Sequence, residues 1–338
     1  MRTLVISDLH LGNRAHRDTV RRPAVRERLL DALDQADRLV LLGDVAELVR
    51  PHPERSLAAA EPVLRAVGRR LGRGREVILV PGNHDRPLLA AWARAQGRAL
   101  TADCAVPPGA SAVLSRVVSW LAPATVQVRY PGVWLDDRTY ATHGHYLDRH
   151  LVPEAPVGLS RGLLARLPSD PALPQDYERR RHRDMASLRP QRTLLSVAAM
   201  SRKAVFSGLP HLLHRTGLSP VTVSLANAQV RRAALPALSR TLLRLGLAPD
   251  FLLFGHIHRR GPLPGDRPED WQVGDRTRLV NTGGWLYEPL LIDGSAPPHP
   301  YWPGGALLLS DGQAPRSVGL LDDLTQAQLR PPPRPRRR

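Results

Sequence analysis

The residues best suited to chemistry occur in five short polar clusters, each directly after an apolar run. In chain order the clusters are Asp8-Leu9-His10, Gly43-Asp44, Gly82-Asn83-His84-Asp85, His143-Gly144-His145 and Gly255-His256-Ile257-His258. They offer carboxylate, imidazole and carboxamide groups and no sulfur, a set that suits Mn, Fe, Zn, Co or Ni better than a soft metal. Alternate side chains of an extended chain point to one side, so Asp8 and His10 can reach the same point.

Each cluster taken alone also has a simpler interpretation. An Asp-x-His pair after a strand is typical of a turn, Asp44 could cap a helix, and the Pro-Gly-Asn-His-Asp run is a good turn sequence. His143 and His145 could be ordinary loop histidines. Five unrelated turns would have no reason to carry this ligand set together, so their joint occurrence favours a metal site. The neighbouring glycines allow the backbone to turn sharply around an ion.

Strands and helices that precede these clusters must position them. Short apolar runs predict strands at 4–7, 39–42 and 77–80, and helical apolar spacing predicts helices at 24–35 and 54–71. Further strands are expected at 126–130 and 133–135 with a Pro-Gly turn between them, and then at 139–141, 251–254, 278–281 and 306–310. The alternation indicates an α/β fold, in which sites form where strand carboxyl ends meet their loops.

Composition limits the class of protein. The chain has 338 residues and 42% hydrophobic content, which is typical of a globular protein with a substantial core. No stretch approaches the ~18 apolar residues of a membrane span, and the first residues lack the apolar region of a signal peptide. The single cysteine, Cys104, excludes an intrachain disulfide. We therefore expect a cytoplasmic protein, with peripheral contact with an anionic membrane as an additional possibility.

The net charge of +17 invites a nucleic-acid or anionic-membrane partner. Part of this charge lies in the Pro/Arg-rich end of the chain, residues 323–338, which we predict to be a disordered tail. The chain has only six Trp, six Tyr and three Phe and no aromatic-basic platform, so a nuclease acting on nucleic acid is the weaker alternative. A solvated basic surface also accounts for the charge. The oligomeric state is left open.

The order of the five clusters resembles that of the calcineurin-like metallophosphoesterases, from Arg2 to about Trp285 apart from a long middle insertion. The resemblance implies an α/β fold of two packed mixed β-sheets flanked by helices, in four layers. It implies two divalent metal ions, with Mn as the first choice and Fe, Zn, Co or Ni as alternatives. The implied reaction is cleavage of a phosphodiester or pyrophosphate bond by a metal-bridging hydroxide, on a nucleotide or a lipid-linked phosphate ester.

The resemblance also assigns roles residue by residue. The seven expected ligands are Asp8, His10 and His258 on the first metal, Asp44 between both metals, and Asn83, His143 and His256 on the second. His84 is expected at the leaving-group side, with Asp85 orienting its imidazole. His145 receives no metal. A non-catalytic metal-binding scaffold is the alternative outside enzymes, and the complete ligand set argues against it.

We divide the chain into a catalytic domain at 1–145 and 250–322, a basic helical insertion at 146–249, and the tail at 323–338. Leu194, Val197 and Val205 share one face of an apolar segment flanked by arginine, and Pro236 is expected to kink or break the next one. The insertion is a structural cap, a partner surface or a lid over a lipid-linked substrate. In position it resembles the insertion of UDP-2,3-diacylglucosamine hydrolases. Those enzymes commonly have arginine where this chain has His84, which favours a more general phosphodiesterase.

Overall fold

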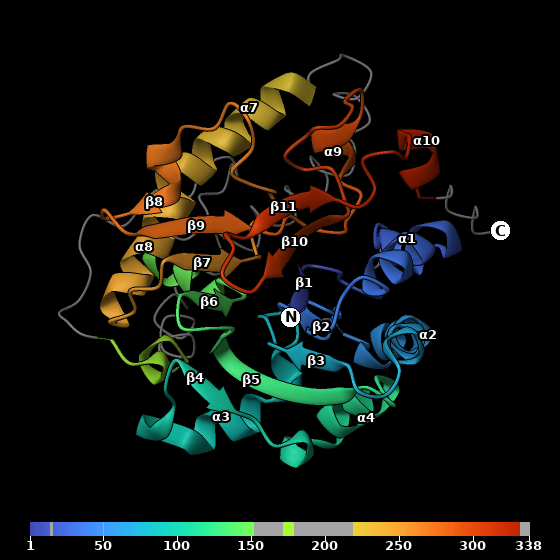
Figure 1. Cartoon of the computed structure of the whole chain (residues 1–338), viewed down its shortest axis with the longest axis vertical. Helices are drawn as coiled ribbons and strands as arrows, with labels where there is room; N and C mark the ends of the chain where they lie inside the picture. The colour runs from blue at the N-terminus through green and yellow to red at the C-terminus, as the bar shows by residue number, and fades with distance from the viewer. Residues whose placement is uncertain (14–15, 50, 152–171, 179–218, 332–338) are drawn as a thin grey trace, which may run out of the picture.

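The structure is a computed structural model that describes residues 1–13, 16–49, 51–151, 172–178 and 219–331 (Figure 1). Leu194, Val197 and Val205, on which the expected lid depends, lie outside the described residues.

The strands of the described residues form one curled mixed sheet with the order β11-β10-β1-β2-β3-β5-β6-β7-β9-β8, and β4 pairs with β5 at its side. Their bounds are β1 Arg2–Ile6, β2 Arg38–Leu41, β3 Glu76–Leu79, β4 Asp103–Ala105, β5 Thr125–Trp134, β6 Thr139–Thr142, β7 Phe251–Phe254, β8 Gln272–Val273, β9 Thr277–Asn281, β10 Gly305–Ser310 and β11 Arg316–Gly319.

Strand β5 joins the two halves of this sheet. Its first residues pair in parallel with β3, up to Val128, and its last residues pair antiparallel with β6, from Gly132 onward. The prediction of two strands with a Pro-Gly turn between them is therefore wrong. Proline lacks the N–H that a ladder needs, but Pro131 lies between the residues that pair with β3 and those that pair with β6, opposite Asp103 of the short strand β4, so the strand continues through it.

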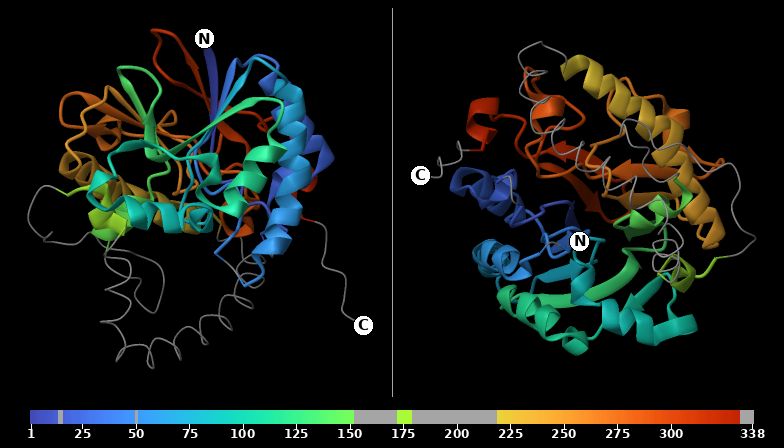
Figure 2. Two further views of the ribbon diagram at one scale, coloured as in Figure 1. Left: turned by 90° about the horizontal axis from the view of Figure 1, so that it is seen from below. Right: turned by 180° about the vertical axis from the view of Figure 1, so that it is seen from behind.

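Helices flank the curled sheet on its outer faces (Figures 1 and 2). Their bounds are α1 Pro23–Leu33, α2 Pro53–Leu71, α3 Ala90–Gln96, α4 Ala112–Trp120, α7 Ser219–Gln229, α8 Leu235–Arg244, α9 Pro289–Ile292 and α10 Gln326–Leu329. Short 3-10 turns lie at Thr19–Arg21, Arg86–Leu88, Gly97–Ala99, Pro108–Ala110, His145–His150 and Pro268–Trp271.

Side-chain alternation along the strands produces the layers. Leu4 and Ile6 of β1 belong to the buried cluster that includes α1, α2 and α4, whereas Val5 points the other way. Val5 shares its cluster with Leu253 of β7, so the two halves of the sheet pack face to face. Phe254, the neighbour of Leu253, instead packs in the cluster that contains α8. The predicted α/β fold of packed sheets flanked by helices is confirmed.

Pro236 was expected to kink or break a helix, and the helix continues past it. A turn of π-helix at Val230–Ala234 links α7 to α8, and Pro236 lies in the first turn of α8. The wider turn accommodates a residue that cannot donate an N–H and whose ring crowds the preceding turn.

The end of the chain is more ordered than the sequence suggested. Thr325 and Gln328 form a capping box at the start of α10, and Leu329 is fully buried. The predicted disordered tail is therefore wrong for residues 323–331, because burial of an apolar side chain and a cap hold them. Residues 332–338 lie outside the described residues. Among the helices that the structure describes, none is long and apolar enough to cross a membrane.

Candidate metal centre

Five loops bring the predicted residues to one place, the carboxyl ends of the parallel strands. The loops follow β1, β2 and β3 in one half of the sheet and β6 and β7 in the other. A hydrogen bond links the halves directly, because the backbone N–H of His256 donates to the side-chain oxygen Oδ2 of Asp8 at 3.0 Å. The site therefore lies where sheet topology allows distant segments to converge.

The backbone at the expected ligands is unusual. Five of these residues have φ between 45° and 69°, in the left-handed region that side-chain-bearing residues rarely adopt: Asp8, His10, Asp44, His256 and His258. Such conformations cost about 1–3 kcal/mol each and cluster at functional sites, where the surrounding structure enforces them. Backbone strain therefore occurs at five of the seven residues that the sequence analysis predicts to bind metal.

Two glycines allow the loops to approach closely. A Cβ at Gly43 would lie 2.4 Å from the ring of His143, and a Cβ at Gly82 would lie 2.3 Å from Asp44 Oδ1. Both distances are shorter than real contacts, so any side chain here would push the loops apart. The prediction that glycine brings the polar clusters together is supported at these two positions.

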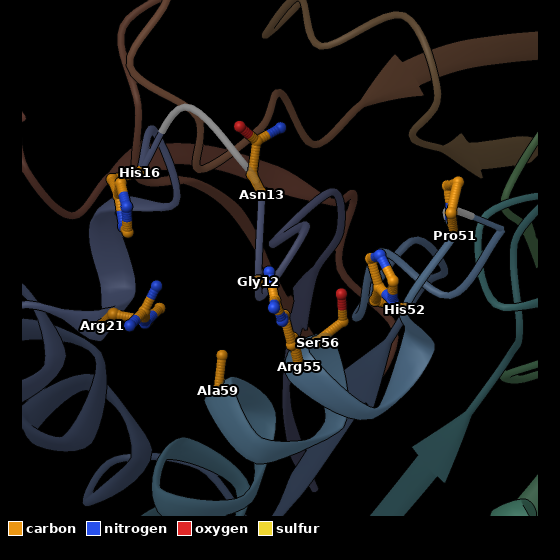
Figure 3. Close-up of a pocket in the computed structure, with 9 residues that line it drawn as sticks. All are labelled: Gly12, Asn13, His16, Arg21, Pro51, His52, Arg55, Ser56 and Ala59. Carbon is orange, nitrogen blue, oxygen red and sulfur yellow. The ribbon is translucent and has the colours of Figure 1, made fainter. Parts of the chain in front are cut away.

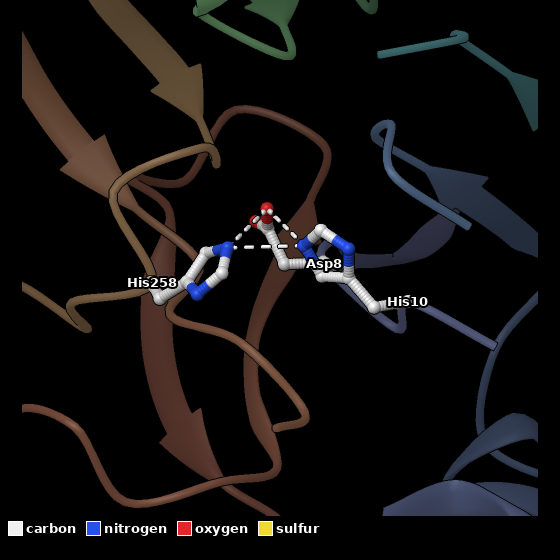
Figure 4. Close-up of side chains that lie close together, drawn as sticks. All are labelled: Asp8, His10 and His258. Atoms are coloured by element: carbon white, nitrogen blue, oxygen red, sulfur yellow. Dashed lines mark hydrogen bonds and ion pairs between the residues drawn. The ribbon is translucent and has the colours of Figure 1, made fainter. Parts of the chain in front are cut away.

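Asp8, His10 and His258 form the first group of facing ligand atoms (Figure 4). His258 Nε2 lies 3.2 Å from Asp8 Oδ1 and 3.1 Å from His10 Nε2. Asp8 Oδ1 is buried and has no hydrogen-bond partner among the described residues. A buried carboxylate oxygen without a donor is costly unless a cation completes it, so the group fits a metal ion.

Asp44, His143 and His256 form the second group. Asp44 Oδ2 lies 3.2 Å from His143 Nε2 and 3.6 Å from His10 Nε2, so one carboxylate oxygen faces both groups. Asn83 Oδ1 is also buried and accepts no hydrogen bond within the described part of the chain. These donors, all nitrogen and oxygen, fit the class of metals expected from the sequence.

Three of the histidines expected as ligands have one ring nitrogen in contact with an oxygen atom that can orient the imidazole. His10 Nδ1 lies 3.4 Å from Glu47 Oε2, and His143 Nδ1 lies 3.0 Å from the carbonyl oxygen of Leu42. His256 Nε2 lies 3.3 Å from Asp148 Oδ1. Contacts of this kind fix the tautomer and orientation of metal-binding imidazoles.

Glu47 and Asp148 were missed by the sequence reasoning. Glu47 stands three residues after Asp44 in the same cluster and Asp148 three residues after His145, so both were within the motifs but without a role.

The charges of the site favour ionised carboxylates. Burial opposes ionisation of Asp8, but the His258 imidazole outweighs it and lowers the pKa of Asp8 to about 2. Burial likewise opposes ionisation of Asp44, and the imidazole of His143 holds the pKa of Asp44 well below its usual range. Burial disfavours the charged form of His143, yet Asp44 raises the pKa of His143 to about 10. Two ionised carboxylates are what a cation requires.

His84 lies at the edge of the site. Its side chain is 25% exposed, and its ring lies edge-on to that of His10 with the centroids 4.8 Å apart. His84 Nδ1 lies 2.5 Å from Glu47 Oε1. Burial lowers the pKa of His84, but the hydrogen bond with Glu47 and the charge of Asp44 prevail, so the pKa is raised above its ordinary value.

Within the described residues Asp85 bonds to backbone N–H groups and Glu47 lies at the ring of His84, which argues against the expected role of Asp85 as the orienting carboxylate. Its two carboxylate oxygens accept backbone N–H groups from Val45 at 3.0 Å, Ala46 at 2.9 Å and Gly82 at 3.2 Å. Asp85 is fully buried and ties the loop after β2 to the loop after β3. It therefore positions the backbone around Asp44, and Glu47 contacts the imidazole instead.

His145 belongs to a buried polar group beneath the site. Its Nε2 lies 3.3 Å from the hydroxyl of Tyr130, which also donates a hydrogen bond to Glu178. Glu178 pairs with Arg86 at 3.1 Å. The short described segment at 172–178, inside the predicted insertion, thus contacts the loop that carries His84.

Residues 1–260 match a family model described as calcineurin-like phosphoesterase. No curated protein matches the chain. Two solved structures that it resembles are a cold-active protein-tyrosine phosphatase of a psychrophile, Shewanella sp., and a point mutant of a cold-active protein tyrosine phosphatase. They are 12% and 13% identical to this chain, with TM-scores of 0.27 and 0.28. Each match covers 94% of this chain and 80% of the matched chain, and a similarity this low does not indicate a role for the protein.

Proposed function

The chain belongs to the calcineurin-like phosphoesterase family, whose members hydrolyse phosphoric esters with metal ions, and we propose that it is a dinuclear phosphodiesterase or pyrophosphate hydrolase. The position of Asp44 carries the proposal, because Asp44 Oδ2 faces His10 at 3.6 Å and His143 at 3.2 Å. A single carboxylate between two ligand groups is suited to bridging two cations. We keep the seven ligands expected from the sequence: Asp8, His10, Asp44, Asn83, His143, His256 and His258.

Divalent cations, when bound here, would neutralise an anionic ester and acidify a water molecule towards neutral pH. The residues of the chain set the conditions for this chemistry. Asp8 and Asp44 supply the negative charge, whereas Asn83 and the histidines add none in their neutral forms. Two divalent cations would outweigh the three carboxylates of Asp8, Asp44 and Glu47, which favours an anionic substrate.

His84 is suited to protonating the leaving oxygen. Glu47 accepts the Nδ1 proton of His84, which leaves Nε2 to face the site, where it lies 3.9 Å from Asp44 Oδ2. The raised pKa of His84 extends the protonated form of the imidazole to higher pH than is usual for histidine. Proton donation of this kind is typically worth about 10²–10⁴-fold in rate.

The substrate is proposed as a class only. A cavity of about 190 Å³ lies against His258, and its lining includes the apolar side chains of Ile257, Leu286 and Leu291 as well as Glu288 and Tyr301. The apolar part of this lining supports an ester group with an apolar portion on this side. We also propose a catalytic domain at 1–145 and 250–322 and a basic insertion at 146–249 that serves as a lid, a structural cap or a partner surface.

The test is hydrolysis of bis(p-nitrophenyl) phosphate by purified, metal-analysed protein, with Mn²⁺ as the first metal added. A panel of phosphomonoesters, nucleotides, pyrophosphates and lipid-linked diesters then ranks the substrates. Turnover that requires metal and prefers diesters or pyrophosphates supports the proposal. Full activity in metal-free protein, or activity on monoesters alone, contradicts it.

A further inference from the structure

A second concave site is lined by residues that follow the expected ligands of the loops after β1 and β2, and by the first residues of α2 (Figure 3). Its volume is about 310 Å³. The polar side chains around it are Asn13, His16, Arg21, His52, Arg55 and Ser56. None of its described lining residues is acidic, so the pocket has a cationic wall that the metal centre does not use.

Arg55 carries the least compensated charge of this wall. It is exposed in the first turn of α2, and no carboxylate of the described residues lies within 4.0 Å of its guanidinium. Two other arginines of the same helix are paired, since Arg65 lies 2.8 Å from Glu61 and Arg70 lies 2.5 Å from Asp34. The α2 N-terminus adds backbone N–H groups that favour anions, as a supporting contribution only.

Asp18 holds the opposite wall in place. Its buried carboxylate accepts the N–H of Gly12 at 2.8 Å and lies 3.5 Å from the guanidinium of Arg21. Asp18 therefore offsets part of the Arg21 charge and fixes the loop that borders the pocket. The net result is a pre-formed cationic concavity rather than a single flexible arginine.

The pocket is close to the reaction site along the loop after β1. Gly12 lines it and stands two residues after His10, a separation of at most about 7 Å along the chain. The loop after β2 carries Asp44 and Glu47 before it reaches His52. We infer that this cationic pocket binds a second phosphoryl group of the substrate, one that is not cleaved. The inference rests on the proposed phosphodiesterase function and narrows its substrate class.

The kinetic test uses two p-nitrophenyl phosphodiesters that differ in one group. One carries a hydroxyalkyl ester group and the other the same group ending in phosphate, with two-, three- and four-carbon spacers. Wild-type protein should show a KM about 10-fold lower for the best phosphorylated diester, because guanidinium–phosphate hydrogen bonds are charge-assisted. Arg55→Gln and Arg21→Gln should remove most of this preference and leave turnover of the hydroxyalkyl diester unchanged. The matched control is Arg65→Gln, on the same helix, which should keep the preference.

A binding test separates this inference from the proposed function. Equilibrium dialysis with labelled inorganic phosphate uses Asp44→Asn protein, alone and combined with Arg55→Gln. The pocket is supported if phosphate binds the Asp44→Asn protein and binds the double variant with Arg55→Gln about 10-fold more weakly. This result would support the pocket even if neither diester is hydrolysed. If phosphate binds but the active enzyme shows no lower KM for the phosphorylated diester, the substrate assignment is overturned. The pocket is then a site for free anions only. No phosphate binding, or a preference that survives both arginine substitutions, overturns the inference altogether.

Discussion

The Oε1 atom of Glu47 lies 2.5 Å from Nδ1 of His84, although the two residues are 37 positions apart in the chain. The other carboxylate oxygen of Glu47 lies 3.4 Å from Nδ1 of His10, an expected metal ligand. One buried carboxylate therefore orients both a ligand and the residue proposed to protonate the leaving group. The two imidazoles hold the pKa of Glu47 well below its usual range against the opposing effect of burial.

Replacing Glu47 tests this relationship through pH dependence. The raised pKa of His84 means that its acid form persists to higher pH, so activity that needs a proton falls as pH rises through that pKa. Glu47→Gln removes the charge and should move this alkaline limb to lower pH by about one unit. The measurement is kcat against pH for an alkyl diester, with metal content determined in parallel. Glu54→Gln, an exposed carboxylate on α2, is the control, and an unmoved limb in the Glu47 variant would contradict the relationship.

Removal of His84 should depend on the leaving group. His84→Ala should retain metal and lose about 10²–10⁴-fold in rate with a methyl leaving group. The loss should be much smaller with p-nitrophenolate, which needs little proton assistance. Equal losses for both substrates would indicate that His84 positions the ester rather than protonating it.

Asp85 should behave differently from His84, because it binds backbone rather than the imidazole. Asp85→Asn replaces one acceptor oxygen with a donor opposite buried N–H groups, so we expect a loss of about 1–3 kcal/mol in the free energy of unfolding. Rates with methyl and p-nitrophenyl leaving groups should fall in the same proportion. Urea denaturation and the two kinetic series measure this. If the rate of Asp85→Asn falls only with the methyl leaving group, Asp85 orients His84, as the sequence analysis predicts.

Asp44 should be needed for both cations. Asp44→Ala is expected to abolish hydrolysis of bis(p-nitrophenyl) phosphate and to reduce bound metal by about two ions per chain, since bridging carboxylates hold both cations. Elemental analysis and circular dichroism distinguish metal loss from unfolding. Asp311→Ala, at an exposed position far from the site, serves as the matched variant. A folded Asp44→Ala protein that keeps both metals would show that the bridge lies elsewhere.

Asp148 should act on metal affinity through His256. The carboxylate lies 3.3 Å from His256 Nε2, and its loss should weaken metal binding by about 10–100-fold. Titration of Mn²⁺ into Asp148→Asn protein measures the effect, with the exposed Asp137→Asn as control. The kcat at saturating metal should recover, because His256 itself remains. If the Asp148→Asn protein binds Mn²⁺ as tightly as the wild type, the proposed effect of Asp148 on His256 is wrong.

Much of the fold and the candidate site could be predicted from the sequence, because both depend on local patterns. Apolar runs of four or five residues end at polar clusters, and β1, β2, β3 and β7 lie within two residues of the predicted strands. Parallel strands in one sheet have their carboxyl ends on the same edge, so convergence of the five clusters followed from the alternation of elements. Asp8, His10, Asp44 and the histidines after β6 and β7 were found in this way.

The remaining features depend on how distant loops pack, which no local pattern encodes. Glu47 and Asp85 are both carboxylates within a few residues of expected site residues, and only the course of the loop over Asp44 decides which one meets His84. Pro131 continues a strand because β5 changes partners there, a property of the whole sheet. Nothing in the local sequence distinguishes Arg21 and Arg55 from the many other arginines of the chain. Only the folded segments after β1 and β2 bring them to one concavity. The types of the ligands are thus written in the sequence, whereas the partners that orient them and the pocket beside them arise from tertiary packing.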